Sequence, residues 1–271
     1  MVLGFSGWMD GGEVSTGTLE YLIRHLDARP LAEIEPGEFY LYNLPGSMEF
    51  TAMFRPQVLL EEGEIREWNE PVNIFWYDQA HRLILLTGRE PHLHWSRYAE
   101  AVFHLAGQFQ VREMVFVGSF AGLAPHTRAP RITGTVSHGE LKAGLARANV
   151  RPANYRGPAS ISTYLAHRAG QKGVRFTTLV AEIPPYIQGR NPRCIEAVLR
   201  RLGALLGLTL DLEDLRRLGD ELETKLNAAV RQRPEILEQI QKLEAAYDKD
   251  IFDTDLSELK TWLEEKGIRL D

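Results

Sequence analysis

The chain has 271 residues, of which 44% are hydrophobic and 25% are charged, and its formal net charge is −6. This composition is typical of a globular protein, and the single cysteine, Cys194, excludes an internal disulfide. The acidic balance disfavours nucleic acid as a partner, because nucleic-acid binding needs a basic face. No apolar run reaches the roughly 18 residues that span a bilayer, and no secretory leader opens the chain. We therefore expect a cytoplasmic protein without a membrane partner.

The first third of the chain predicts a buried strand, a helix and a β-rich stretch. An apolar run at residues 2–5 enters a glycine-rich turn, and leucines at helical spacing follow over residues 13–26. Between residues 31 and 87 the pattern predicts strands at 39–42, 58–60, 65–68, 74–77 and 83–86. Glu62-Gly63-Glu64 predicts a hairpin turn between the second and the third of these strands.

Helices and buried strands alternate from residue 94 onward. The sequence predicts helices at 94–109, 141–148, 161–169 and 191–206, and strands at 114–118, 132–136 and 176–182. The strands at 2–5, 114–118 and 176–182 are buried runs, which is typical of strands covered on both faces. The predicted fold class is therefore a three-layer α/β/α domain with a mostly parallel central sheet, which the stretch at 31–87 extends or decorates.

The last quarter of the chain differs in charge and pattern. Residues 210–271 hold 17 acidic and 10 basic side chains, and apolar side chains recur there at helical spacing on both sides of Pro234. This pattern predicts two long antiparallel helices, closed by a short helix at 256–266. We therefore divide the chain into an α/β domain, residues 1–209, and an acidic helical segment, residues 210–271.

The first candidate site is the loop after the first strand, which reads Gly7-Trp8-Met9-Asp10-Gly11-Gly12. Loops between a strand and a helix bind ligands in open α/β sheets, because helix N–H groups point outward there. Asp10 would then hold a ligand beside Gly12. The alternative is a tight turn in which Asp10 caps the helix and Trp8 fills a groove. The glycine spacing is not that of a nucleotide-binding loop, and no cofactor is expected.

Polar and aromatic side chains follow the strand at 83–86. Glu90 and Trp95 are expected at the rim of the same sheet edge. His92 and His94 form an H-x-H pair, but at a helix start their rings diverge by about 200°. Cys194 lies far away in the sequence and completes no ligand set, so no metal site is expected.

A second loop, residues 118–128, follows the most apolar strand and brings His126, Thr127 and Arg128 together. Arg128 could bind a carboxylate or a phosphate, and His126 could transfer protons near neutral pH. The alternative is a structural loop in which Arg128 pairs with an acidic neighbour. Tyr186 follows the strand at 176–182 and could reach the same rim.

Two further side chains have a structural interpretation. Ser160 lacks the G-x-S-x-G surroundings of a hydrolase nucleophile and is expected to cap the helix at 161–169. Cys194 has no identifiable histidine partner and is expected to be a small buried side chain. No catalytic residue is predicted.

These motifs, in this order, resemble the proteasome-assembly-chaperone-2 family over residues 1–208. The motifs are Gly7-Trp8-Met9-Asp10-Gly11-Gly12, Glu90-Pro91 with Trp95, Pro125-His126-Thr127-Arg128, Tyr155 with Gly157-Pro158, Pro184-Pro185-Tyr186 and Asn191-Pro192. The resemblance implies an α/β/α fold similar to that of nucleoside phosphorylases and hydrolases, and a tendency to self-associate. It also implies a protein partner, because eukaryotic and archaeal relatives bind proteasome α-subunits during assembly.

Two functions from different classes remain open. The first is a non-catalytic, protein-binding or assembly-chaperone-like protein that forms homo-oligomers, with a proteasome-related partner only where the source cell has a proteasome. The second is a small-molecule-binding protein or enzyme with an anion site at the carboxyl ends of the strands. The candidate ligand or partner site comprises Trp8, Asp10, Gly12, Glu90, Trp95, His126, Thr127, Arg128, Tyr155 and Tyr186. A single cavity lined by the polar members of this set would favour the second function.

Overall fold

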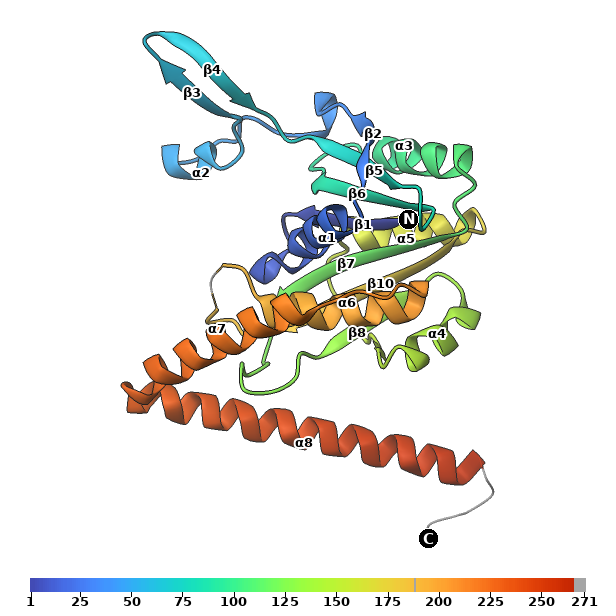
Figure 1. Cartoon of the computed structure of the whole chain (residues 1–271), viewed down its shortest axis with the longest axis vertical. Coiled ribbons are helices and arrows are strands. Elements are labelled where there is room, and N and C mark those ends of the chain that lie inside the picture. Colours follow the sequence, from blue (N-terminus) through green and yellow to red (C-terminus); the bar gives the residue numbers. More distant parts are fainter. Residues whose placement is uncertain (188, 266–271) are drawn as a thin grey trace.

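The structure, a computed structural model, describes residues 1–187 and 189–265, and within those ranges it describes side chains up to residue 250. It confirms the predicted three-layer α/β/α architecture with a mostly parallel central sheet (Figure 1). The strands follow one another across the sheet in the order β2 (Arg29–Ile34), β5 (Asn73–Asp78), β6 (Leu83–Arg89), β1 (Val2–Ser6), β7 (Glu113–Ala121), β10 (Arg175–Ile183), β8 (Ile132–Val136) and β9 (Arg151–Pro152).

Four neighbouring strands at the centre of the sheet, β6, β1, β7 and β10, are parallel to one another. β5 and β8 flank them in antiparallel orientation. Successive residues of a strand point to opposite faces, and Val115 and Phe116 are both buried, so both faces of the sheet are covered. The carboxyl ends of the four parallel strands meet at one edge of the sheet. We call it the carboxyl edge, and the predicted site residues other than Tyr155, which comes after β9, follow these strands.

Two layers of helices cover the sheet. On one face α1 (Val14–His25), α4 (Lys142–Arg147) and α6 (Pro192–Leu206) pack around a core that includes Leu19 and Leu199. On the other face α3 (Trp95–Gln108) and α5 (Ile161–Gln171) pack around Tyr98 and Leu165. Short 3-10 turns lie at η1 (Gly11–Glu13), η2 (Gly37–Phe39) and η3 (Gly139–Leu141).

The two structural interpretations made for single side chains are confirmed. Ser160 caps α5, because its Oγ accepts a hydrogen bond from the Thr163 backbone N–H at 3.3 Å. Cys194 is 3% exposed, and burial raises the pKa of its thiol to about 12. A thiol in that state is not a nucleophile near neutral pH.

The C-terminal segment forms two helices, α7 (Glu213–Arg231) and α8 (Pro234–Glu265). Leu215 of α7 joins the core beside α6. The prediction of a separate helix at 256–266 was wrong, because α8 continues to Glu265 and its last predicted residue, Lys266, lies outside the described residues. No proline or glycine interrupts the sequence between Pro234 and that point. Along residues 1–187 and 189–265, no helix combines the length and apolar character needed to cross a membrane.

The stretch at 31–87 contributes both to the sheet and to a separate hairpin. The strand predicted at 39–42 was wrong: η2 ends at Phe39 and residues 40–42 form neither helix nor strand. The Tyr40 hydroxyl donates a hydrogen bond to the Arg89 carbonyl at 2.7 Å. β2 was not predicted, because Pro30 and two charged residues hide its pattern, and a proline is tolerated on an edge strand. The short helix α2 (Met48–Ala52) was also missed. β3 (Gln57–Glu61) and β4 (Glu64–Asn69) form the predicted hairpin, which projects from the body of the molecule (Figure 1).

Candidate functional site

Asp10 lies in the loop between β1 and α1 and binds the first turn of that helix. Its Oδ1 accepts from the Thr16 backbone N–H at 3.0 Å, and its Oδ2 accepts from the Thr16 hydroxyl at 2.8 Å. Gly12 has φ of 62°, in the left-handed region, and a Cβ there would lie 3.1 Å from that of Asn191. Both residues therefore shape the turn that leads into α1, as the capping interpretation predicted.

Burial raises the pKa of the Asp10 carboxyl from 3.8 to about 6, although hydrogen bonds from Thr16 act in the opposite direction. The folded chain thus holds this proton more tightly than the unfolded chain. The carboxyl stabilises the fold fully below pH 3.8, and this contribution is lost as the pH rises to about 6. At neutral pH the ionised group is buried at a cost of about 2–3 kcal/mol.

Replacing this carboxyl by an amide should therefore stabilise the protein at neutral pH. Asp10→Asn keeps an acceptor for the Thr16 N–H and a donor for its hydroxyl, but it removes the buried charge. We expect the free energy of unfolding to rise by about 2 kcal/mol at pH 7.5 and to stay unchanged near pH 4. Urea denaturation at both pH values measures this difference. Asp27→Asn, at an exposed aspartate, is the control, and an equal effect of Asp10→Asn at both pH values would contradict the account.

Glu90 joins two loops of the carboxyl edge. Its carboxylate accepts from the Trp8 backbone N–H at 3.1 Å and from the Ile161 backbone N–H, at the start of α5, at 3.3 Å. Trp95 is the first residue of α3: its Nε1 donates to the Pro91 carbonyl at 2.8 Å, and its ring packs against Tyr164 of α5. Both residues therefore hold neighbouring segments of the chain together. Trp8 does not fill a groove, because more than half of its side chain is exposed.

Glu182, at the end of β10, fixes the loop that carries His126 and Arg128. Its carboxylate accepts from the Leu123 backbone N–H at 2.7 Å and forms an ion pair of 3.2 Å with Arg131. Both ends of this loop are thus tied to one carboxylate that is only 9% exposed. Sequence reasoning missed the role of Glu182. The available signal was a lone acidic residue at the end of the predicted strand 176–182, which carries no other charge.

His126 is buried in a network of hydrogen bonds rather than in an open site. Its backbone N–H donates to the Tyr186 hydroxyl at 2.9 Å, and that hydroxyl lies 2.8 Å from His126 Nδ1. On the other side of the ring, Nε2 lies 3.2 Å from Asn227 Oδ1 of α7. An amide oxygen only accepts, so Nε2 carries the proton and Nδ1 accepts from Tyr186. Both ring nitrogens are therefore engaged within the chain.

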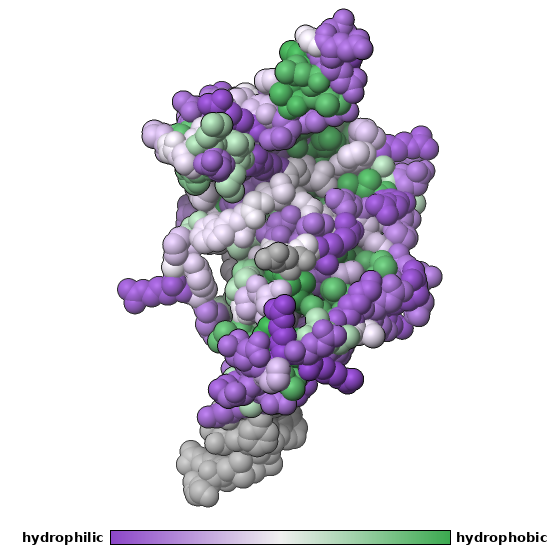
Figure 2. Space-filling model, turned by 90° about the vertical axis from the view of Figure 1, so that its left-hand side faces the viewer, coloured by the Kyte–Doolittle hydropathy of each residue, from purple (hydrophilic) through white to green (hydrophobic). Residues whose placement is uncertain are grey.

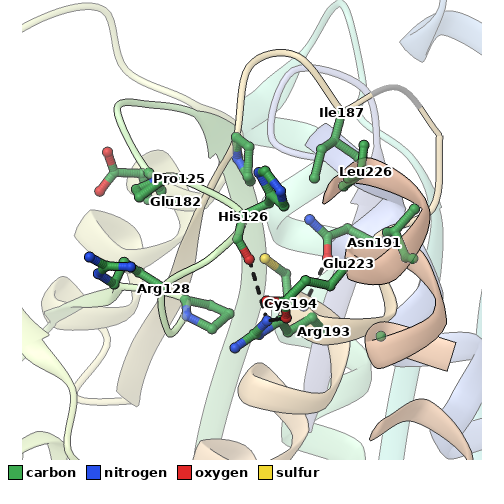
Figure 3. Close-up of a pocket in the computed structure, with 15 residues that line it drawn as sticks. Pro125, His126, Arg128, Glu182, Ile187, Asn191, Arg193, Cys194, Glu223 and Leu226 are labelled. Atoms are coloured by element: carbon green, nitrogen blue, oxygen red, sulfur yellow. Dashed lines mark hydrogen bonds and ion pairs between the residues drawn. The ribbon is translucent and has the colours of Figure 1, made fainter. Parts of the chain in front are cut away.

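α7 closes the space beside His126 (Figure 3). Arg193 of α6 donates to the His126 carbonyl at 3.3 Å and also pairs with Glu223 of α7. The cavity that remains between these elements has a volume of about 20 Å³. That volume holds about one water molecule and is far below the roughly 300 Å³ of a small-molecule site.

Arg128 forms ion pairs with two acidic side chains of α8. Its guanidinium donates to both carboxylate oxygens of Asp248, at 2.8 and 2.7 Å, and lies 3.5 Å from Glu244. The Thr127 hydroxyl also donates to Glu244. The guanidinium lowers the pKa of the Asp248 carboxyl through this pairing. The bidentate geometry that could bind an anionic ligand is thus used for a contact within the chain.

Tyr247 is the buried residue beside this ion pair and anchors α8. Its side chain is 7% exposed, its hydroxyl donates to the Ala129 carbonyl at 2.7 Å, and the Arg131 guanidinium lies 4.5 Å from its ring centroid.

Tyr247→Ala removes the buried ring, the hydrogen bond and the cation–π contact, which together contribute about 3 kcal/mol locally. We expect amide hydrogen exchange in residues 240–250 to accelerate by about 100-fold, as measured by mass spectrometry. Lys242→Ala, which removes an exposed pair within α8, should leave this exchange unchanged; equal acceleration in both variants would contradict the anchoring role.

The five polar candidates do not line one cavity. His126 and Arg128 line the small space under α7, and Tyr186 contacts His126, whereas Asp10 and Glu90 bind backbone groups elsewhere on the carboxyl edge. In Figure 3 the Arg128 side chain extends away from the His126 ring. Each of these five side chains therefore connects segments of the chain, and large apolar or aromatic side chains, among them Trp8, Phe120 and Leu123, are exposed on this edge beside charged ones such as Arg156.

These features define an α/β/α protein in which the polar side chains of the carboxyl edge bind groups of the chain itself, while several large apolar and aromatic side chains of that edge are exposed. The chain belongs to the PAC2 family, which it matches over residues 4–230. No curated protein matches the chain significantly by sequence.

Solved structures share the fold of this chain. A PAC2 family protein from Streptomyces avermitilis is 23% identical, with a TM-score of 0.74, over 88% of this chain and 98% of its own. A proteasome-assembly chaperone homologue from Mycobacterium tuberculosis is 22% identical, with a TM-score of 0.77 and the same coverage. An archaeal proteasome activator from Pyrococcus furiosus is 23% identical, with a TM-score of 0.61, over 84% of this chain and 91% of its own.

Proposed function

We propose that this chain is a non-catalytic, cytoplasmic, assembly-chaperone-like protein that binds a protein partner at the carboxyl edge and also associates with itself. One observation carries the proposal. Four large side chains on loops and strand ends of this edge, Trp8, Phe120, Leu123 and Tyr155, are between 43% and 72% exposed. We call them the strand-end patch. Clustered apolar and aromatic side chains that the fold leaves exposed are typical of protein interfaces.

The topology supports the placement of this patch. Trp8 follows β1, Phe120 and Leu123 lie at the end of β7, and these two strands are parallel neighbours. Tyr155 precedes α5, whose first N–H binds Glu90 together with the Trp8 N–H. The remaining candidate residues then have a common role, which is to hold the loops that carry the patch. They are Asp10, Gly12, Glu90, Trp95, His126, Thr127, Arg128 and Tyr186.

The chemical class of the partner follows from the surface and from the relatives. An apolar and aromatic patch suits a folded protein surface and offers no basic face to a nucleic acid. Two of the similar structures are described by their names as a proteasome-assembly chaperone homologue and a proteasome activator. A proteasome subunit is accordingly the first partner to test in a source cell that has a proteasome, and another multisubunit complex is the first in a cell that lacks one.

A thermal-shift experiment separates this function from that of a small-molecule site. A ligand of the folded state must raise the apparent stability of the protein. We expect no shift of the Tm with carboxylates, nucleosides and phosphates at millimolar concentration, because the polar groups that would bind them already have partners. A shift of several degrees that Arg128→Ala abolishes would overturn the proposal in favour of an anion site.

A further inference from the structure

The hairpin of β3 and β4, which we call the ribbon, has no support from the rest of the fold. Every residue from Gln57 to Asn69 is exposed, and the ribbon stands apart from the sheet (Figure 1). A two-stranded hairpin alone is at best marginally stable in water and needs a further surface to cover its apolar face. The ribbon has such a face.

The pairing of the two strands separates apolar from acidic side chains. Val58 lies opposite Trp68 and Leu60 opposite Ile65, and these four share one face because residues two apart in a strand point the same way. A register shift at Leu59/Leu60 places Ile65 on this face. The four side chains are between 47% and 65% exposed. Figure 2 shows the result: the uppermost projection is hydrophobic on one side and hydrophilic on the other.

The opposite face carries the charges of the ribbon. Leu59 lies opposite Glu67, and Glu61 lies opposite Glu64. The apolar face contains no charged side chain. Two copies of the ribbon can therefore meet through their apolar faces while the acidic faces stay in water, without placing like charges together.

We propose that a second copy of this chain covers the apolar face, so that two ribbons pack face to face around a two-fold axis. The inference rests on the self-association proposed above and assigns its contact surface. Two-fold symmetry brings identical surfaces together, and an axis that runs across the strands places the pair of Val58 and Trp68 in one copy against the pair of Leu60 and Ile65 in the other. A surface that meets its own copy must not place like charges together, and the uncharged apolar face of the ribbon meets that condition.

The apolar area available is suited to a stable contact. Met48, Phe50 and Met53, on α2 and just after it, are exposed as well, and α2 lies near the base of the ribbon (Figure 1). Together with the ribbon face they provide several hundred Å² per copy, comparable to the roughly 800 Å² that each partner contributes to a standard interface. A single copy leaves this area in water.

Two neighbouring leucines provide a matched pair of variants. Leu60→Glu places a charge on the apolar face, whereas Leu59→Glu places it on the acidic face. In sedimentation equilibrium of the full chain we expect Leu60→Glu to raise the dimer dissociation constant by at least about 100-fold, because the charge would be buried without a partner. Leu59→Glu should leave that constant within a few-fold of the original.

A cross-link tests the two-fold geometry directly. Cys194, the one cysteine of the natural sequence, is buried, so in a mixture of Ile65→Cys and Trp68→Cys chains a bifunctional thiol cross-linker should join position 65 of one copy to position 68 of the other. Dimers that persist in Leu60→Glu, or that Leu59→Glu weakens equally, would overturn the ribbon contact while leaving self-association intact. A chain that stays monomeric at all concentrations would overturn both, and capture of a different protein by the ribbon of a monomeric chain would assign the face to that protein. Partner binding at the strand-end patch is measured separately and is independent of these outcomes.

Discussion

The double variant Trp8→Glu/Leu123→Glu is expected to lose capture of its protein partner by at least about 100-fold, because exposed tryptophans at interfaces contribute about 2 kcal/mol or more each. Both side chains belong to the strand-end patch and are more than half exposed. Their replacement should therefore leave folding intact. The measurement is the amount of partner recovered per tagged chain from cells of the source organism, together with the Tm of each variant.

The control for this experiment is a charge placed on another exposed aromatic position. Phe109 follows α3 and is also exposed. Because α3 leads into β7, this residue lies at the opposite edge of the sheet. Phe109→Glu should retain full capture. Equal loss in both variants would mean that charge, rather than the position of the patch, determines recovery.

Glu182→Ala is expected to have the largest effect on stability. It removes the carboxylate that accepts from the Leu123 N–H and pairs with the partly buried Arg131, whose other ion pair, with Asp250, remains. Losing the charged hydrogen bond and the ion pair together costs about 3 kcal/mol, and the apparent Tm should fall by roughly 6–10 °C. Urea denaturation and calorimetry measure both quantities.

Two further variants make the Glu182 result interpretable. Glu140→Ala breaks the exposed pair with Arg175 and should change stability by less than about 0.5 kcal/mol. Glu182→Gln keeps an acceptor for the Leu123 N–H and should recover part of the loss. If Glu182→Ala lowered the free energy of unfolding by no more than Glu140→Ala does, the conformation of the loop from residue 122 to residue 131 would not depend on the Glu182 carboxylate.

The sequence allowed much of the fold to be predicted, because burial leaves a local pattern. The apolar runs that became β1, β7 and β10 and the helical periods of α3, α5 and α6 are short-range signals. β2 was missed because an edge strand needs no apolar run on both faces. The boundary at residue 209 stays a prediction.

The candidate site was harder to predict, because its partners are distant in the sequence. Arg128 pairs with Asp248, which is 120 residues away along the chain, and His126 lies beside Asn227, which is 101 residues away. A loop motif shows which groups are available, but it does not show that an acidic helix folds back and occupies them. Phe120 and Leu123, which are exposed on this edge, lie in the predicted loop 118–128, of which only His126, Thr127 and Arg128 were singled out as site residues.

Photo-cross-linking in living source cells tests the central claim most directly. A photoreactive residue at position 123 lies in the strand-end patch, and one at position 79 lies in the exposed turn before β6, at the other edge of the sheet. The account predicts a light-dependent adduct with a defined protein at position 123 and none at position 79. No adduct at position 123, or the same adducts at both positions, would contradict a protein-binding carboxyl edge.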